Sequence, residues 1–392
     1  MKIKIFTFGC KTNQYDGQLL KENLEANGWT VTADNDFETA LINSCCVTAN
    51  AEKEIKHLIT KISKEGRKVW LTGCFTDKFT DLFPDITIFS KNFLMDNYFH
   101  SKIHSISRFS SHTRTFIKIE DGCENFCTYC IVPYTRGKIK SRNSAEIIDE
   151  IKNITNNGCK EIVLTGTNLG RYGKDTDTDL SHLLAHIFKI RELRRLRISS
   201  IELLHLSDSI LKMLSESEKF CPSFHIPLQS GSDNVLHKMA RRYKIQDYID
   251  KTEKIKTLFP DVTFTTDIMV GFPGETDKDF LETLDIIKQI GFLKVHIFPF
   301  SPRERTPAFS FPWQVPEKIK KERAKTAKEI SEKVSMEVKN QFLNREFDVL
   351  IEEKKGGYWF GHTKNYLPVI FKSSKDLHNK IVNVQISFHN IQ

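Results

Sequence analysis

The stretch Glu120-Asp121-Gly122-Cys123-Glu124-Asn125-Phe126-Cys127-Thr128-Tyr129-Cys130 places three cysteines within eight residues, in a C-x3-C-x2-C spacing. Zinc sites usually take four ligands in pairs, and His205 and His225 are too remote in sequence to complete the set by motif. Iron–sulfur clusters bind Cys thiolates, and a cubane held by three of them leaves one iron open to a small molecule. Gly122 lets the backbone turn tightly, and Tyr129 can pack on such a molecule. The spacing therefore predicts an open iron–sulfur cluster on these three cysteines.

The cysteine loop follows the first of six predicted strands in a region where strands and helices alternate. This succession predicts an open, partial (β/α)6 barrel, in which active-site loops follow the carboxyl ends of the strands. The loop lies on that side. The predicted strands are 115–119, 161–165, 195–199, 222–227, 262–269 and 294–298, and the predicted helices are 144–157, 179–190, 207–217, 233–257 (broken near 242–246) and 276–290.

The N-terminal region holds a second group of cysteines. Strands predicted at 2–8, 40–42 and 69–71 alternate with two amphipathic helices, which indicates a parallel α/β sheet. A cysteine follows each strand, and the carboxyl ends of parallel strands share one edge, so these thiols should converge on one site. The alternative is three buried core cysteines, because free Cys is often buried. The residues concerned are Cys10, Cys45 or its neighbour Cys46, and Cys74.

The remaining chain divides into a linker and two C-terminal elements. Residues 101–114 are polar and indicate a linker, and 316–343 have a charged helical pattern whose balanced charges favour a solvated face. From about residue 345 the pattern becomes that of strands, with a hairpin signal at Gly356-Gly357. This predicts a small all-β barrel, a type of module that binds RNA by stacking and charge, or alternatively a structural cap. We expect three domains, at 1–107, 108–340 and 341–392, with Cys159 and Cys221 as packing residues.

Composition narrows the class of protein. The chain has 392 residues, 39% hydrophobic and 28% charged, which is ordinary for a globular protein. No stretch approaches the roughly 20 apolar residues of a membrane span, and the start does not resemble a signal peptide, so we expect a cytoplasmic protein without membrane contact. The net charge of +8 permits a polyanionic partner. Two basic clusters could serve it or simply be solvated: Arg136, Lys138, Lys140 and Arg142; and Lys189, Arg191, Arg194, Arg195 and Arg197.

Several motifs together resemble the methylthiotransferase family of radical S-adenosylmethionine (SAM) enzymes over essentially the full length. Members of this family have an N-terminal domain with three cysteines, a radical SAM domain and a C-terminal TRAM domain. Within it, the first motif, the stretch from Leu164 to Gly170 and Gly361-His362-Thr363-x-Asn365-Tyr366 resemble the branch acting on N6-threonylcarbamoyladenosine in tRNA. The matching stretches are Phe8-Gly9-Cys10-Lys11-Thr12-Asn13-Gln14-Tyr15, Asn43-Ser44-Cys45-Cys46, Thr72-Gly73-Cys74, Leu164-Thr165-Gly166-Thr167-Asn168-Leu169-Gly170, Ser199-Ser200-Ile201-Glu202, His225-Ile226-Pro227-Leu228-Gln229-Ser230-Gly231 and Asp267-Ile268-Met269-Val270-Gly271-Phe272-Pro273-Gly274.

The resemblance implies a reaction with two [4Fe–4S] clusters. SAM would bind the open iron at Cys123, Cys127 and Cys130, and its one-electron cleavage would give a 5′-deoxyadenosyl radical that takes the hydrogen from C2 of the adenosine at tRNA position 37. A second cluster on the N-terminal cysteines would carry the sulfur, and a second SAM would supply the methyl group. The family usually has one cysteine where this chain has Cys45 and Cys46, and alignment favours Cys45. The chain is also shorter than many relatives around 75–110 and at the C-terminus.

The resemblance also suggests residues that contact SAM, each with an alternative role in loop packing or capping. They are Tyr129, Thr165, Gly166, Asn168, Ser200, Glu202, Gln229, Ser230 and Arg241. The implied partners are tRNA and an external electron donor, and we expect a monomer. Three alternatives remain at this point: the same chemistry on isopentenyladenosine in tRNA, the same chemistry on a ribosomal protein, or an iron–sulfur protein that binds RNA or senses redox state without catalysis.

Overall fold

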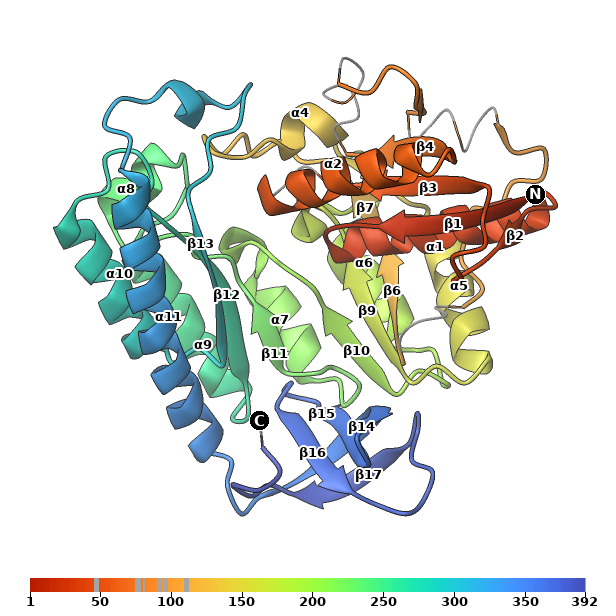
Figure 1. Ribbon diagram of the computed structural model, residues 1–392. Helices are drawn as coiled ribbons and strands as arrows, with labels where there is room; N and C mark the ends of the chain where they lie inside the picture. The colour runs from red at the N-terminus through yellow and green to blue at the C-terminus, as the bar shows by residue number, and fades with distance from the viewer. Residues whose placement is uncertain are drawn as a thin grey trace.

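The N-terminal domain is a five-stranded parallel sheet with the strand order β2-β1-β3-β4-β5 (Figure 1). The computed structural model describes residues 1–45, 49–74, 79, 82–90, 94, 98–108 and 113–391. The predicted parallel sheet is confirmed, and two short strands at its edges, β2 and β5, escaped the sequence pattern. The elements are β1 (Lys2–Thr7), α1 (Lys11–Ala26), β2 (Thr30–Val31), β3 (Thr39–Ser44), α2 (Ala49–Lys64), β4 (Lys68–Gly73) and β5 (Thr87–Ile88).

The central region is an open parallel barrel in which six strands follow one another in chain order. Two three-stranded sheets, β6-β9-β10 and β11-β12-β13, join through parallel bridges from Leu196 to Phe220 and from Ser200 to His225. All six predicted strands are confirmed. They are β6 (Arg114–Lys118), β9 (Glu161–Thr165), β10 (Arg195–Ile198), β11 (Ser223–His225), β12 (Thr263–Val270) and β13 (Lys294–Pro299).

Helices cover the outer face of the barrel, and the predicted break near 242–246 separates two of them. Leucine and isoleucine side chains of the helices and strands form one large core cluster, which fixes the barrel wall. The helices are α5 (Ser144–Asn156), α6 (Leu180–Ile187), α7 (Asp208–Ser215), α8 (Asp233–Lys238), α9 (Ile245–Leu258) and α10 (Asp277–Ile290). Around the cysteine loop lie β7 (Glu120–Asp121), α4 (Val132–Arg136) and β8 (Lys140–Ser141).

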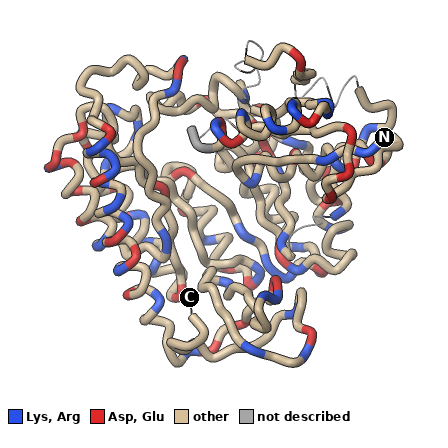
Figure 2. The backbone as a smooth tube through the Cα atoms, in the orientation of Figure 1, with Lys and Arg blue, Asp and Glu red and all other residues tan. Residues whose placement is uncertain are grey.

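A long helix leads from the barrel to the C-terminal sheet. Helix α11 (Glu317–Asn340) packs on β13 and α10, and charges of both signs alternate along it (Figure 2). The C-terminal sheet is antiparallel, with the order β16-β15-β14-β17, and Ile391 pairs with Val369 on the far edge strand, which curls the sheet. Its strands are β14 (Glu346–Lys355), β15 (Tyr358–Thr363), β16 (Pro368–Lys372) and β17 (Ile381–Gln385).

Two arginines of β10 fasten the C-terminal sheet to the amino ends of the barrel strands. Arg195 donates to the carbonyls of His362 (3.0 Å) and Asp348 (2.7 Å). Arg197 donates to the carbonyls of Thr363 (2.8 Å) and Lys364 (2.7 Å) and pairs with Glu161 (2.6 Å). Both side chains are almost fully buried. The hypothesis that the second basic cluster forms an accessible surface is therefore wrong for these two residues, whose charges hold two domains together.

The first basic cluster is likewise divided between inside and outside. Arg136 and Arg142 point inward, where Arg142 pairs with Glu150 (2.7 Å), while Lys138 and Lys140 are exposed. The expected linker at 101–114 is also more tightly held than predicted over its described part. For example, Asn23 of α1 exchanges two 2.9 Å hydrogen bonds with the backbone of Ile103. Residues 109–112 of this segment lie outside the described residues.

Candidate functional site

The barrel cysteine loop follows β6 and β7 and is tied down on two sides. The backbone N–H of Cys123 donates to the Gly137 carbonyl (3.0 Å), and that of Thr128 donates to the Met239 carbonyl (3.1 Å). Gly122 has a φ of +91°, and a Cβ there would lie 2.1 Å from the Lys138 carbonyl oxygen. A side chain at this position would therefore push the loop off the segment before β8, which explains the glycine before the first cysteine.

Nitrogen donors from the loop after β9 and from the segment between α8 and α9 reach the sulfurs of this loop. The amide of Asn168, after β9, lies 3.6 Å from the Cys123 Sγ, and the Arg241 guanidinium lies 3.8 Å from the Cys127 Sγ. Burial raises the pKa of Cys130 to about 12, so this thiol needs a cationic partner to ionise. Three thiols with N–H donors directed at two of them fit an iron–sulfur cluster, because iron supplies the positive charge and the donors stabilise the sulfurs.

A cavity of about 230 Å³ opens beside Cys127. Arg241 and Glu202 cross one side of it as an ion pair, with 2.9 Å between Nη1 and Oε1, and the Tyr243 hydroxyl lies 3.1 Å from the same guanidinium. Sequence reasoning singled out Glu202 and Arg241 but missed His205, which also lines the cavity. A charged, partly enclosed cavity against a cysteine sulfur suits a zwitterionic small molecule.

The Thr165 hydroxyl is buried and accepts from the Ser199 hydroxyl (3.4 Å), and Gly166 lies next to a buried carboxyl that the sequence did not single out. A Cβ on Gly166 would lie 2.2 Å from Glu120 Oε1, and the same oxygen accepts from the Asn168 backbone N–H. The other oxygen, Oε2, has no hydrogen-bond partner among the described residues. Burial raises the pKa of Glu120 to about 8. The sequence feature that could have indicated a role for Glu120 is its position directly before the Asp-Gly-Cys sequence.

The other four suggested SAM contacts are spread more widely. Tyr129 packs beside Phe298 in the apolar cluster under the loop, and exposed Ser200 bridges to β11. Gln229, at a φ of +71°, donates its backbone N–H to the carbonyl of Asp267 (2.8 Å). Ser230 is fully buried, and its described contacts join it to α10 and the start of α8 rather than to the cysteine loop. These four assignments stay predictions.

The N-terminal cysteines sit at the carboxyl edge of their sheet, as the topology predicted. Cys10 is exposed at the start of α1, and Cys45 and Cys74 are buried directly after β3 and β4. Gly9 has a φ of +95°, and a Cβ there would lie 2.5 Å from the Cys45 Sγ, so only glycine lets the Cys10 loop approach Cys45 this closely. Cys46 lies outside the described residues, so the choice between it and Cys45 stays a prediction.

One buried amide holds these strand ends together. The Asn13 Nδ2 donates to the carbonyls of Phe8 (2.6 Å) and Ser44 (3.0 Å), the residues preceding Gly9 and Cys45. Ser44 in turn accepts from the backbone N–H of Cys74 (3.1 Å). The third thiol loop is thus fixed to the second. This network explains the asparagine three residues after Cys10, and it preorganises three thiols at one edge.

A single guanidinium connects the two cysteine sites. Arg136 of α4 donates from Nε to the Cys74 Sγ (3.1 Å), from Nη1 to Asp121 (2.6 Å) and from Nη2 to the Asn13 Oδ1 (3.4 Å). Asp121 lies two residues before Cys123, and Lys118 of β6 pairs with Asp16 of α1 close by. The two sites therefore face one another across the domain boundary, with a cation fixed between them.

The comparisons with known proteins agree with this geometry. The radical SAM superfamily matches residues 117–287, and the Uncharacterized protein family UPF0004 matches residues 2–87. The chain is 40% identical to the threonylcarbamoyladenosine tRNA methylthiotransferase MtaB of Thermotoga maritima, over 89% of this chain and 86% of that protein. It is 33% identical to the tRNA-2-methylthio-N(6)-dimethylallyladenosine synthase of Fervidobacterium nodosum, over 99% and 96%.

A solved structure shares the fold at low sequence identity. The radical SAM methyltransferase TsrM of Kitasatospora setae superposes with a TM-score of 0.58 at 13% identity, covering 79% of this chain and 76% of that one. This likeness concerns the fold alone. The identity to curated relatives over nearly the whole chain assigns the family, and the two facing cysteine sites are its structural counterpart. The chain is therefore a member of the tRNA methylthiotransferase family of radical SAM enzymes.

Proposed function

We propose that this enzyme adds a methylthio group to C2 of N6-threonylcarbamoyladenosine at position 37 of tRNA. The observation that carries the reaction is the pair of three-cysteine sites joined by Arg136, because one site suits radical formation and the other suits sulfur delivery. The choice of nucleoside rests on the relatives: the Thermotoga protein at 40% identity is named for threonylcarbamoyladenosine, and the Fervidobacterium protein at 33% for dimethylallyladenosine.

Membership of the radical SAM superfamily brings SAM and one [4Fe–4S] cluster. We assign that cluster to Cys123, Cys127 and Cys130, and SAM to the adjoining cavity. Glu202 and Arg241 line the cavity, and their ion pair offers an acceptor and a donor to the amino and carboxylate groups of SAM. When bound, cluster and SAM supply a 5′-deoxyadenosyl radical. The remaining suggested contacts, Tyr129, Thr165, Gly166, Asn168, Ser200, Gln229 and Ser230, belong to the same proposal.

A second [4Fe–4S] cluster is assigned to Cys10, Cys45 and Cys74. Their loops are preorganised by the Asn13 amide, and the Arg136 N–H on the Cys74 sulfur stabilises that ligand as a thiolate. This cluster would supply the sulfur. On this assignment the sulfur source and the radical source would lie on opposite sides of one substrate site.

We propose domain boundaries at 107–108 and 340–341, and we assign RNA binding to the C-terminal sheet. No helix in the described ranges could span a membrane. We propose a monomeric, cytoplasmic enzyme that takes electrons from an external donor.

Anaerobic reconstitution with iron and sulfide tests the proposal. With dithionite, SAM and a tRNA bearing N6-threonylcarbamoyladenosine, we expect 5′-deoxyadenosine and the 2-methylthio nucleoside, both measured by mass spectrometry. Absence of 5′-deoxyadenosine would favour an iron–sulfur protein without catalysis. A product formed instead on isopentenyladenosine tRNA, or on ribosomal protein, would keep the reaction and reject the substrate.

A further inference from the structure

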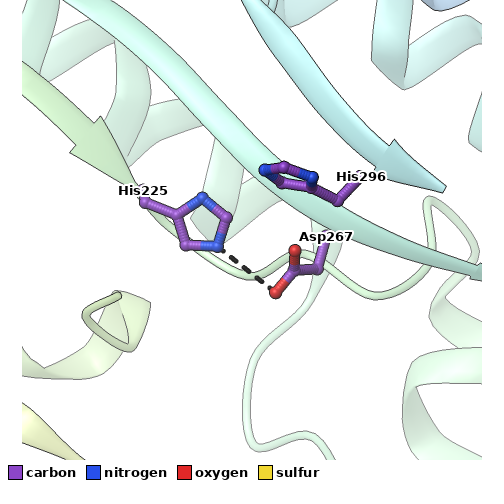
Figure 3. Close-up of side chains that lie close together, drawn as sticks. All are labelled: His225, Asp267 and His296. Carbon is purple, nitrogen blue, oxygen red and sulfur yellow. Dashed lines mark hydrogen bonds and ion pairs between the residues drawn. The ribbon is translucent and has the colours of Figure 1, made fainter. Parts of the chain in front are cut away.

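A polar cluster lies on the inner face of the barrel, on three adjacent strands that the reaction so far leaves unused. His225 of β11, Asp267 of β12 and His296 of β13 point toward one another (Figure 3), and their ligand atoms lie within 4.8 Å. The His225 Nε2 lies 3.2 Å from the Asp267 Oδ2, and its Nδ1 lies 2.8 Å from the Thr265 hydroxyl. The cluster is therefore an ordered hydrogen-bonding group rather than a chance meeting of side chains.

Two of these three side chains, those of Asp267 and His296, remain clearly accessible to solvent. Along β12, Phe264, Thr266 and Ile268 are buried against the helices, whereas the Asp267 side chain keeps 30% of its surface exposed. His296 on the edge strand is also exposed. Ionisable side chains that turn inward in a barrel and still meet solvent indicate a chamber that can admit a ligand.

The chamber lies directly beneath the cysteine loop. Met269 follows Asp267 by two residues on the same face of β12, and it belongs to the apolar cluster on which Tyr129 packs. Two residues of strand advance about 7 Å. A ligand group beside Asp267 would therefore lie about 7 Å along the strand from the layer that contains Tyr129, the residue before Cys130.

The N-terminal domain contributes a cation to this chamber. Lys11, next to Cys10, is accessible to solvent but surrounded by protein, since burial lowers the pKa of its ammonium, and it lies within electrostatic reach of Tyr366, Arg114, Arg197 and Asp267. Arg114 and Arg197 are already paired, with Glu352 and Glu161 respectively. Among the described residues, no carboxylate lies within ion-pair distance of the Lys11 ammonium. Its charge is thus available to an anionic ligand.

We propose that Lys11, His225, Asp267 and His296 bind the threonyl arm of the modified adenosine and select it over uncharged arms. This inference rests on the proposed function. The arm carries a carboxylate, a hydroxyl and a urea, so Lys11 would pair with the carboxylate while His296 and Asp267 hydrogen-bond to the other groups, and His225, held by Thr265, would orient Asp267. An isopentenyl arm offers none of these partners and would leave the polar groups unsatisfied, which is a strong basis for rejection.

The same residues could in principle ligate a divalent cation, and two observations favour the organic arm. Both nitrogens of His225 are already in hydrogen-bond contact with protein oxygens. Lys11 and Lys294 place positive charge around His296, which opposes a cation.

A substrate-by-variant cycle tests the inference. Anticodon stem–loop RNAs would carry either N6-threonylcarbamoyladenosine or its uncharged threoninamide analogue. We expect the enzyme to favour the acid at least about tenfold in kcat/KM, and Lys11→Met to remove that preference by slowing only the acid. Lys328→Met, on the exposed side of α11, is the matched control and should preserve the preference. Iron content and 5′-deoxyadenosine formation report whether both clusters survive each change.

His296→Leu provides a second variant on a strand that carries no cysteine. It should narrow the preference for threonylcarbamoyl over isopentenyl RNA by about tenfold. Equal slowing of acid and amide by Lys11→Met with intact clusters would overturn the inference, as would a stoichiometric divalent metal that His296→Leu removes. If the unaltered enzyme modifies only isopentenyl RNA, that result rejects the proposed substrate and therefore also this inference.

Discussion

The two cysteine sites reach a similar result by different routes. In the barrel, one loop of eight residues carries all three thiols, and the rest of the fold adds donors such as Asn168 and Arg241 around them. In the N-terminal domain the thiols come from three separate strand ends, which Asn13 and a close approach at Gly9 bring together. The three thiols of the barrel site are brought together by one loop, so their spacing depends little on the rest of the fold. The three thiols of the N-terminal site come together only when the parallel sheet has formed.

The largest effect should come from removing one thiol at each site. Cys127→Ala should abolish 5′-deoxyadenosine formation, because SAM cleavage needs the barrel cluster. Cys74→Ala should keep that cleavage and abolish the methylthio product. Each variant should lose about four irons. Cys159→Ala is the control and should keep both activities, because the described contacts of this thiol are with Thr115 and the backbone carbonyls of Thr113 and Glu161 rather than with either cysteine site. Product formation by Cys74→Ala would remove the distinction between the sites.

A methyl group at Gly9 should damage only the assembled site. In Gly9→Ala the new Cβ would lie 2.5 Å from the Cys45 sulfur, and we expect the product yield to fall more than about tenfold while SAM cleavage continues. Gly28→Ala is matched, because Gly28 also has a positive φ, of +82°, but no atom lies within 4 Å of its added Cβ. If both substitutions reduce the yield equally, backbone strain rather than contact with Cys45 is responsible.

Arg136 should matter to both sites because it joins them. Its side chain is only 8% exposed, and Arg136→Met would remove the guanidinium that donates to both Asp121 and the Cys74 sulfur. We expect a loss of about 3 kcal/mol in the free energy of unfolding and faster release of iron from the N-terminal cluster. Lys138→Met, in the same segment but exposed, should change neither quantity. Denaturant unfolding and the rate of bleaching by a chelator measure the two effects.

The smallest effect concerns Glu120, under the barrel loop. Burial raises its pKa from 4.5 to about 8, so the folded protein keeps a proton that the unfolded chain has lost. The free energy of unfolding should therefore fall as pH rises between these values and level off above them. Glu120→Gln should lessen that fall by about 2 kcal/mol, seen in denaturant unfolding of the cluster-free protein at pH 5 and pH 8.5. If the free energy of unfolding falls equally with pH in Glu120→Gln and in the unaltered protein, this prediction is wrong. Glu146→Gln, at an exposed position, is the control and should leave the pH dependence unchanged.

Much of the fold could be predicted from local patterns. All six barrel strands and the break between α8 and α9 follow from hydrophobic periodicity, and the position of Cys10, Cys45 and Cys74 at one edge of the sheet follows from parallel-sheet topology. The short edge strands β2 and β5 have only two residues each, too few for a period to register.

Residue roles set by tertiary contact could not be predicted. Arg136 and Arg197 look like parts of basic surface runs, and only the fold turns them inward to Asp121 and Glu161. The chamber around His225 escaped notice for the same reason: its members lie on separate strands, and Lys11 comes from another domain. The spacing of residues along the sequence does not show that residues on separate strands and domains lie close together in the fold.

The arginine anchors of β10 fix the distance between the C-terminal sheet and the barrel cysteine loop. They fix the C-terminal sheet at the amino ends of the parallel strands, while the cysteine loop lies at the carboxyl ends. The longest barrel strand, β12, has eight residues, which is about 26 Å of height. An RNA that contacts both ends must span that length, more than one nucleotide can. The sheet cannot move closer to the loop without breaking the hydrogen bonds of two buried guanidinium groups, so the RNA binding that we propose for the sheet would require a fixed distance between the bound stem and the reacting base.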